Sequence, residues 1–256
     1  MTHPFFTGTR HPRVLAHRGL TPANDGDSSV WENTAAAFAA AHAAGAEYIE
    51  TDCQVTADGD VVLFHDETLA RLVGDPRPVA SVRTRELENL LAEHGGLLTV
   101  ADALDAFPEV RFNIDVKTPA AAVPLGPALA AHAHRVLVTS FSDRNRVAAL
   151  DSTERAGAEI RPATSGGRSV IARLRALSAA RLSPARALRD IDAVQIPEVH
   201  RGLRLFTPSL LRAAHRHGVE VHVWTVNDPA DMTRLVAAGA DGIVTDRAHA
   251  ALSALF

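Results

Sequence analysis

The sequence predicts an α/β fold, a closed (β/α)8 TIM barrel. Short apolar runs alternate about eight times with alanine-rich helical segments, which is typical of a parallel barrel. The length of 256 residues is also typical of a single barrel of this kind. No glycine-rich loop follows the first apolar run, which disfavours a doubly wound open sheet.

The first elements follow from local patterns. Residues 14–16 form an apolar strand, and residues 34–44 form an alanine-rich helix that Asn33 or Thr34 would cap. Residues 48–55 form a second strand, and the Asp58-Gly59 turn joins it to a short strand at 61–64. We therefore expect a strand, a helix and a strand hairpin in the first quarter of the chain.

Residues from about 69 to 98 interrupt this alternation with glycine and proline turns and one helical piece at 84–92. We expect an insertion within a single domain that spans residues 1–256. The alternation then resumes, with strands expected at 110–116, 136–140, 158–161, 193–196, 220–226 and 242–245, and with helices that include 208–217 and 229–238, each opened by proline.

Composition excludes several classes of protein. The net charge is −4 and no basic run occurs, so we expect no nucleic-acid partner. Cys53 is the only cysteine, which excludes an intrachain disulfide. Because Cys53 lies in an apolar strand, we expect it to be a buried core residue. The first 13 residues lack a signal-peptide pattern and no apolar run reaches 18 residues, so a cytoplasmic protein without stable membrane insertion is expected. The oligomeric state is not determined by the sequence.

Polar motifs lie at or near the ends of the expected strands. In a parallel barrel these ends share one rim, where active sites of such barrels lie. The motifs are His17-Arg18-Gly19, Glu50-Thr51-Asp52, His65-Asp66, Asp115-Val116-Lys117 and Ser140-Phe141.

Three acids of these motifs are candidate metal ligands. Glu50 and Asp52 lie two residues apart on one strand, so their side chains share a face. Asp115 on a neighbouring strand would add a third carboxylate. Hard oxygen donors favour Mg²⁺ or Ca²⁺ over zinc. Glu50 alone would be read as an ordinary surface acid, but three acids at adjacent strand ends favour a metal.

The two rim histidines are candidate catalytic groups. An imidazole gains or loses a proton near neutral pH, so His17 and His65 can serve as general base and general acid. We assign the base to His17 and the acid to His65, although the sequence leaves the direction open. Asp66 is expected to fix the loop of His65.

Basic residues at the same rim indicate an anionic substrate. Arg18 can make two hydrogen bonds to a phosphate, and Lys117, the only lysine in the chain, adds a compact charge. Glu32 could be a metal ligand, a partner of Arg18 or a helix start, of which we favour the partner of Arg18. Together these groups describe a site for acid–base cleavage of a phosphate ester.

The ordered set of motifs resembles the glycerophosphodiester phosphodiesterase family. The resemblance runs from about residue 17 to residue 246, nearly the whole chain. The motifs that carry it are His-Arg-Gly at 17, Glu-Asn-Thr at 32, Glu-Thr-Asp at 50, His-Asp at 65, Asp-Val-Lys at 115, Ser-Phe at 140, Gln-Ile-Pro-Glu at 195, Trp-Thr-Val-Asn at 224 and Gly-Ala-Asp-Gly-Ile-Val-Thr-Asp at 239.

The resemblance implies a (β/α)8 barrel that hydrolyses glycerophosphodiesters to glycerol 3-phosphate and an alcohol with a divalent metal. It also implies a cap formed by the insertion. Carried over by residue, His17 and His65 match the acid–base pair, Glu50, Asp52 and Asp115 match the metal ligands, Arg18 and Lys117 match the phosphate contacts, and Trp224 matches an aromatic pocket wall, for which core packing is the equal alternative.

Three positions depart from the family pattern. The loop from Leu20 to Trp31 is longer than usual, and Trp31 stands where proline is common. Asp115 stands where many members carry glutamate, and its carboxylate lies about 1.5 Å further back, one C–C bond. An Asp-x-Lys motif is similar to that of sphingomyelinase D.

Two alternative functions remain open. One is a phospholipase D-type or sphingomyelinase D-like enzyme acting on a lipid headgroup, which would need more apolar rim surface than the scattered leucines and valines of residues 69–98 offer. The other, less favoured, is a non-catalytic barrel that binds a metal or phosphate. The sequence does not determine which alcohol the substrate carries, nor whether water or the substrate 2-hydroxyl attacks.

Overall fold

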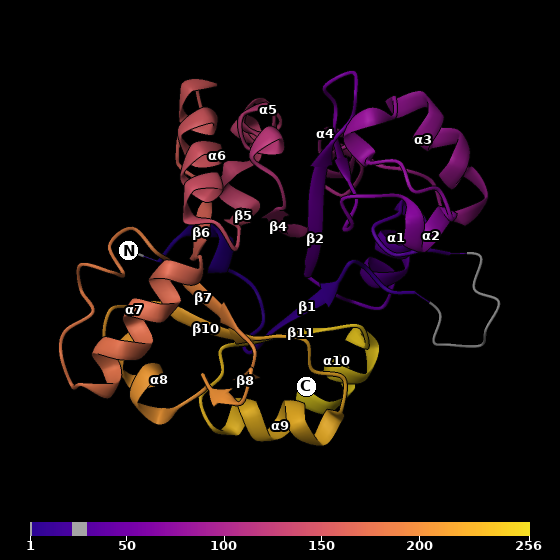
Figure 1. Cartoon of the computed structure of the whole chain (residues 1–256). Helices are drawn as coiled ribbons and strands as arrows, with labels where there is room; N and C mark the ends of the chain where they lie inside the picture. The colour runs from indigo at the N-terminus through magenta and orange to yellow at the C-terminus, as the bar shows by residue number, and fades with distance from the viewer. Residues whose placement is uncertain (1, 22–29) are drawn as a thin grey trace.

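The computed structural model describes residues 2–21 and 30–256, and within these ranges eight parallel strands close into a barrel. Each strand pairs with the next, and β1 pairs with both β2 and β11, which closes the ring. This confirms the predicted (β/α)8 barrel (Figure 1). In order around the barrel, the strands are β1 (Arg13–His17), β2 (Tyr48–Val55), β4 (Arg111–Val116), β5 (Val136–Thr139), β6 (Ala163–Gly166), β7 (Ala193–Ile196), β10 (Glu220–Val223) and β11 (Gly242–Thr245).

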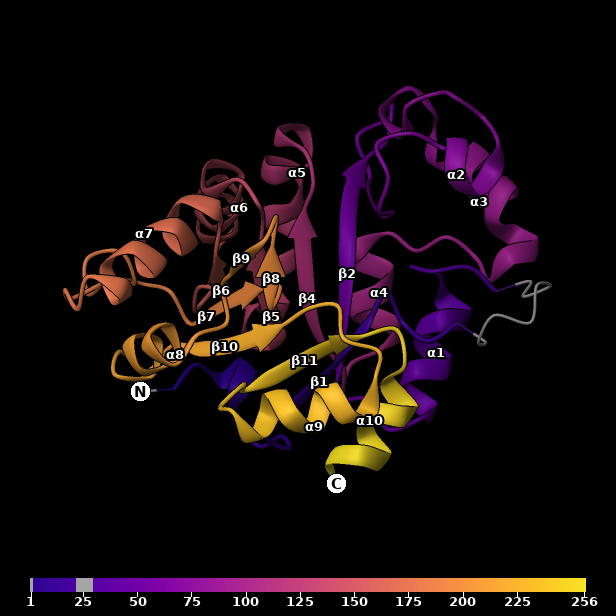
Figure 2. The ribbon, with the colours of Figure 1, turned by 60° about the horizontal axis from the view of Figure 1, so that its bottom comes forward.

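Helices surround the strands on the outside of the barrel (Figures 1 and 2). Side-chain oxygens of Thr34, Thr99, Thr207 and Asp228 accept backbone N–H groups at four helix starts, which satisfies donors that a helix leaves free. The helices around the barrel are α1 (Ala35–Ala43), α4 (Val100–Ala106), α5 (Pro119–Leu129), α6 (Asp143–Arg155), α7 (Arg168–Ala179), α8 (Pro208–His215), α9 (Pro229–Ala237) and α10 (Ala248–Leu255).

The segment after β2 leaves the barrel. The strand β3 (Val61–Leu63) runs antiparallel to β2. Apolar side chains of the following segment pack in a cluster of their own with Val62 and Phe64. Trp31 stacks on His94 with 3.6 Å between ring centroids, which ties this segment to the start of α1. Its elements are α2 (Ala70–Val73), η2 (Val79–Ser81), α3 (Thr84–Leu91) and η3 (Ala92–His94).

The sixth barrel strand differs from the expectation. A strand was expected at 158–161, but the strand is Ala163–Gly166, and Ile160 is largely exposed. The sequence Ala-Thr-Ser-Gly of β6 has a weak strand signal. Pairing with β5 on one side and β7 on the other forms this strand, so tertiary contacts decided its position.

The two ends of the barrel are filled differently. Phe5 and Phe6, in the short helix η1 (Pro4–Phe6), pack with Leu15 and Tyr48 in a cluster at the N-terminal ends of the strands. The larger core lies between strands and helices, and it includes Cys53, whose burial raises the pKa of its thiol. Residues at the C-terminal ends of the strands line a cleft. Among the described residues, no helix has the length and apolar character needed to cross a bilayer.

Candidate active site

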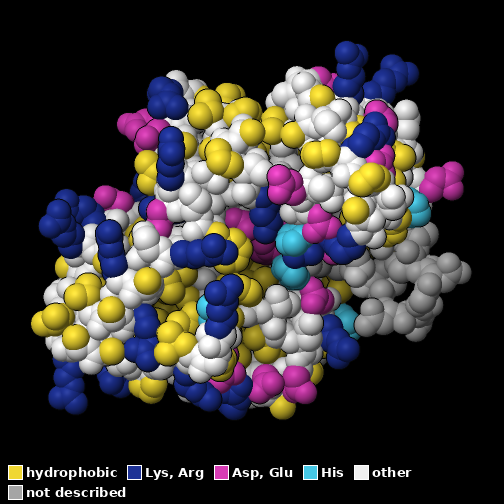
Figure 3. All heavy atoms as spheres, viewed as in Figure 1, with side chains coloured by type: hydrophobic (Ala, Val, Ile, Leu, Met, Phe, Trp, Pro, Cys, Tyr) yellow, Lys and Arg dark blue, Asp and Glu magenta, His cyan; other side chains and the backbone are white. Residues whose placement is uncertain are grey.

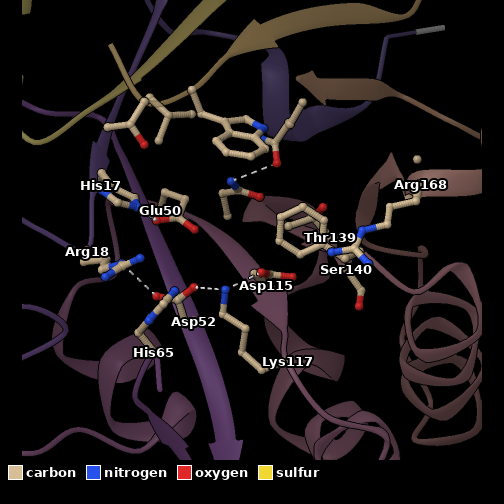
Figure 4. A pocket seen from close by; sticks show the side chains of 18 of the residues that line it. His17, Arg18, Glu50, Asp52, His65, Asp115, Lys117, Thr139, Ser140 and Arg168 are labelled. Carbon is tan, nitrogen blue, oxygen red and sulfur yellow. Dashed lines mark hydrogen bonds and ion pairs between the residues drawn. The ribbon is translucent and has the colours of Figure 1, made fainter. Parts of the chain in front are cut away.

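A cleft of about 190 Å³ opens at the C-terminal ends of the barrel strands. Figure 3 shows histidine, acidic and basic side chains gathered at the centre of one face, and Figure 4 shows the cleft from close by. The predicted site residues that line it are His17, Arg18, Glu50, Asp52, His65, Asp115, Lys117 and Trp224. Glu32 contacts the site through Arg18.

His17 ends β1 and is held by an acid from the other end of the chain. Its Nδ1 donates to Asp246 Oδ1 at 2.5 Å, and its Nε2 lies 3.8 Å from Glu50 Oε2. Burial lowers the pKa of His17, but the hydrogen bond to Asp246 and the charge of Glu50 outweigh burial, so the pKa is raised. Asn227 in turn donates to Asp246 Oδ2 at 2.6 Å. The imidazole is therefore fixed with Nε2 toward the acids of the cleft.

Asp246 and Asn227 were not among the predicted site residues. Both lie in motifs that carried the family resemblance. However, Asp246 contacts His17 across 229 positions of the sequence, and Asn227 reaches His17 only through Asp246. Only their place after the late strands β10 and β11 signalled a position at the rim.

His65 reaches the same cleft through a hairpin. The hairpin predicted at the Asp58-Gly59 turn is confirmed, because β3 runs antiparallel to β2. His65 therefore does not end a parallel barrel strand, as its grouping with the other strand-end motifs implied. The hairpin returns the chain to the rim, where Phe64 N donates to Asp52 O at 3.0 Å. His65 Nδ1 then donates to Asp66 Oδ1 at 2.6 Å. Asp66 thus holds the His65 ring directly, whereas the expectation was that it fixes the loop.

The carboxylates expected to bind a metal surround the lone lysine. Asp52 and Asp115 are paired residues of β2 and β4. Lys117 Nζ lies 2.7 Å from Asp52 Oδ1 and 2.7 Å from Asp115 Oδ2. Burial lowers the pKa of Lys117, but the two carboxylates outweigh burial and raise it. Burial raises the pKa of Asp52, but Lys117 and Arg18 outweigh it and hold that pKa below its usual value.

Glu50 differs from the other acids because it lacks a hydrogen-bonded partner for one oxygen. Its Oε2 is buried without such a partner among the described residues. Burial and the nearby charge of Asp52 raise the pKa of Glu50 to about 8. A buried oxygen of this kind is costly unless a proton or a cation satisfies it.

The donor set fits a hard divalent cation. Glu50, Asp52 and Asp115 supply carboxylate oxygens at one end of the cleft, and such oxygens are the preferred ligands of Mg²⁺ and Ca²⁺. Within the described ranges, no group of three or more His, Cys, Asp or Glu side chains is arranged as a ready metal cage. The ammonium of Lys117 instead lies between two of the three acids, so metal binding would require these side chains to rearrange.

Arg18 is held in position by backbone geometry and two acids. Its φ is 57° and that of Gly19 is 89°. A Cβ on Gly19 would lie 2.8 Å from the Ala37 carbonyl carbon, so only glycine fits there. Arg18 Nε lies 3.2 Å from Asp52 Oδ2, and Nη1 donates to Glu32 Oε1 at 2.9 Å. Glu32 therefore lies where the favoured reading placed it, beside Arg18.

The acids next to Arg18 are supported by the surrounding loops. Asn33, expected as a possible helix cap, instead donates to Asp52 Oδ2 at 3.1 Å, and Thr34 caps α1. Arg71 of α2 pairs with both Glu32 and Asp66. No local pattern indicated Arg71, because it lies in the segment where the strand–helix alternation breaks.

Aromatic side chains form the opposite wall. Trp224 meets Phe141 edge-on with 6.0 Å between ring centroids, and both line the cleft. Trp224 also packs against the cluster at the bottom of the barrel. Both readings of Trp224, pocket wall and core packing, therefore describe part of its surroundings.

The geometry brings acid–base groups, cations and carboxylates into one cleft. Residues 17–250 match the model of the Glycerophosphoryl diester phosphodiesterase family. The chain belongs to this family.

Individual phosphodiesterases and related enzymes show the extent of the similarity. A probable glycerophosphodiester phosphodiesterase 2 from Mycobacterium tuberculosis is 37% identical, over 92% of this chain and 87% of that protein. A lysophospholipase D from Rattus norvegicus is 31% identical over 41% of this chain and 36% of its own length. A solved phosphodiesterase from Oleispira antarctica, in complex with its product sn-glycerol-3-phosphate, aligns with a TM-score of 0.70 and 21% identity, over 96% of this chain and 97% of that one. At this identity the last similarity shows the fold.

Proposed function

We propose that the protein hydrolyses glycerophosphodiesters to glycerol 3-phosphate and an alcohol, with a divalent metal and two histidines. One observation carries the proposal: two imidazoles, each held by an aspartate at Nδ1, line a cleft that also contains three carboxylates, an arginine and a lysine. Family membership supports the same reaction class.

The histidines would transfer the protons. Because Nδ1 of each ring donates to an aspartate, Nε2 is left to face the substrate. One Nε2 takes a proton from the nucleophile. The other gives a proton to the oxygen of the departing alcohol, so the protons balance. Attack by water gives glycerol 3-phosphate directly, whereas attack by the substrate 2-hydroxyl gives a cyclic phosphate that water then opens, with the two histidines exchanging roles. The assignment of base to His17 and acid to His65 stays a prediction.

The two cations would bind the phosphate while they remain paired with acids. Lysine has three donors, of which two point to Asp52 and Asp115, and the third remains for a phosphate oxygen. Arginine has five donors, and the contacts of Arg18 with Asp52 and Glu32 leave several free. The acids thus fix both cations in place before the substrate arrives.

A metal would be held by Glu50, Asp52 and Asp115, whose oxygens fit Mg²⁺ or Ca²⁺. When bound, such an ion supplies positive charge that stabilises the reacting phosphoryl group. Glu50 Oε2, which is buried and accepts no hydrogen bond from the described residues, supports this role.

A panel of glycerophosphodiesters assayed with and without chelator tests the proposal. Glycerol 3-phosphate should appear with the untreated enzyme, disappear with chelator and return with either Mg²⁺ or Ca²⁺. Asp115→Asn should weaken metal binding in calorimetry, whereas Asp151→Asn, at an exposed position of α6, should not. Failure to release glycerol 3-phosphate, or full activity with chelator, would contradict the proposal.

A second candidate is a lysophospholipase D activity, which the similarity to the rat enzyme over 41% of this chain favours. Lysophosphatidylcholine, compared with glycerophosphocholine at equal concentration, separates the two. Faster turnover of the lysophospholipid would reverse our preference, and metal-dependent turnover of either compound would exclude a barrel that only binds.

A further inference from the structure

We infer that Arg168 selects glycerophosphodiesters whose alcohol is neutral or anionic against those whose alcohol is cationic. The inference rests on the proposed function, because it names the substrate class of the same cleft. It comes from a cation that neither the acid–base pair nor the candidate metal site uses.

Arg168 lies across the cleft from the reacting groups. It is the first residue of α7, and Figure 4 shows it on the side opposite His17 and Arg18. Its guanidinium carbon lies 4.8 Å from the centre of the Phe141 ring, within the range of a cation–π contact. Phe141 is 47% exposed and is braced by the edge of Trp224.

The Phe141 ring lies near Arg168 and also near Lys117, one of the residues proposed to bind the phosphate. Lys117 Nζ also lies near this ring, at 5.9 Å from its centre. Lys117 belongs to the acid cluster at Asp52 and Asp115, and Arg168 lies to the right of these residues in Figure 4. A substrate whose phosphate contacts Lys117 would therefore extend its next group along Phe141 toward Arg168.

No acid in the described part of the chain forms an ion pair with the guanidinium of Arg168. Asp143 at the start of α6 lies close by, but its oxygens accept N–H groups of Gly167 and Ser169 and pair with Arg146. The acids that line the cleft, Glu50, Asp52 and Asp115, form no ion pair with Arg168 among the described residues, and two of them pair with Lys117 instead. An approaching alcohol therefore meets a net positive charge.

The positive charge of Arg168 determines which alcohol groups of the substrate bind well. A quaternary ammonium binds to a free aromatic face or beside an acid, but the face of Phe141 already holds a guanidinium. Hydroxyl and anionic groups instead accept hydrogen bonds from that guanidinium. Two unit charges of the same sign 4 Å apart in water repel by about 1 kcal/mol, roughly a fivefold effect on binding.

Three substrates that share glycerol and phosphate and differ in the charge of the alcohol test the inference. They are glycerophosphocholine, glycerophosphoglycerol and glycerophosphoinositol 4-phosphate. We expect kcat/KM to rise in that order, with steps of ~5–10-fold, and to lose part of this spread at high salt. Arg168→Gln should flatten the order and Arg168→Glu should reverse it. Both side chains are compatible with the first turn of a helix.

Arg173→Gln on the exposed side of the same helix is the matched control, and it should leave the order unchanged. An equal loss for all three substrates in Arg168→Gln would show that Arg168 contacts the shared glycerol phosphate and would overturn the inference, as would an unchanged order. Absence of glycerol 3-phosphate from all three with the natural enzyme would instead contradict the proposed function.

Discussion

The two ends of the barrel contain the same kinds of charged side chain but use them differently. At the N-terminal end, His222 is fully buried and its Nε2 donates to Glu220 at 3.0 Å. Gln195 donates to His222 Nδ1 at 3.3 Å, and Arg13 pairs with Glu220 at 3.0 Å. Every titratable group of this network therefore has a direct partner.

At the C-terminal end, the pairing is incomplete. His17 and His65 each use one ring nitrogen for an aspartate. Glu50 Oε2 is buried without a hydrogen-bond partner in the described part of the chain. Charged groups at the bottom of the barrel that all have partners therefore stabilise the fold, whereas charged groups at the rim that lack some of their partners are available to a ligand.

The largest expected effect tests the rim. His17→Ala and His65→Ala should each lower kcat by about 10²–10⁴-fold, because each removes one proton-transfer partner. Steady-state kinetics measure the loss, and thermal unfolding should change little. His42→Ala, at an exposed position of α1, is the control. Near-full activity in both rim variants would refute the two-histidine scheme.

A variant at the N-terminal end of the barrel should lose stability but keep its activity. Arg13→Met leaves Glu220 without its arginine partner, which should lower the free energy of unfolding by about 3–5 kcal/mol, as is usual when a buried pair loses one member. Urea unfolding measures this loss. The activity per folded molecule should persist. Arg155→Met on the exposed surface of α6 should have little effect, and equal stability losses in the two variants would contradict the contrast.

The network of Arg13, Glu220 and His222 predicts that the free energy of unfolding depends on pH. Burial raises the pKa of Glu220, but the hydrogen bond from His222 and the charge of Arg13 outweigh it and lower the pKa to about 2. Glu220 therefore stabilises the fold fully above its unfolded pKa of about 4.5, and this stabilisation is lost as the pH falls toward 2, a difference of about 3 kcal/mol.

Unfolding by urea at several pH values between 6 and 2 measures this dependence. The natural protein should lose more stability over this range than Glu220→Gln does. If stability depended on pH equally in the two proteins, the partners of Glu220 would not lower its pKa, and the prediction would be wrong.

A smaller loss of activity is expected when His17 stays in place but its imidazole is less well oriented. Asp246→Asn weakens the hold on His17 Nδ1, so kcat should fall by ~10²-fold while KM changes little. Asp151→Asn is the matched control. If kcat were unchanged in Asp246→Asn, the aspartate would not position the imidazole.

Local pattern predicted most of the fold. Strands at 48–55, 193–196 and 242–245 coincide with the observed strands, because apolar and β-branched runs have a strong strand signal. The prolines at 208 and 229 mark the observed starts of α8 and α9. The long loop noted at Leu20 to Trp31 lies mostly outside the described residues.

The sequence predicted most of the side chains that gather at the rim, because barrel strands end on one side and the motifs follow those ends. It also predicted the hairpin that precedes His65. The partners of these side chains came from the tertiary structure, which placed Lys117 between Asp52 and Asp115 and brought Asp246 to His17. Contacts of this kind depend on distances between residues far apart in the chain, which no local periodicity encodes.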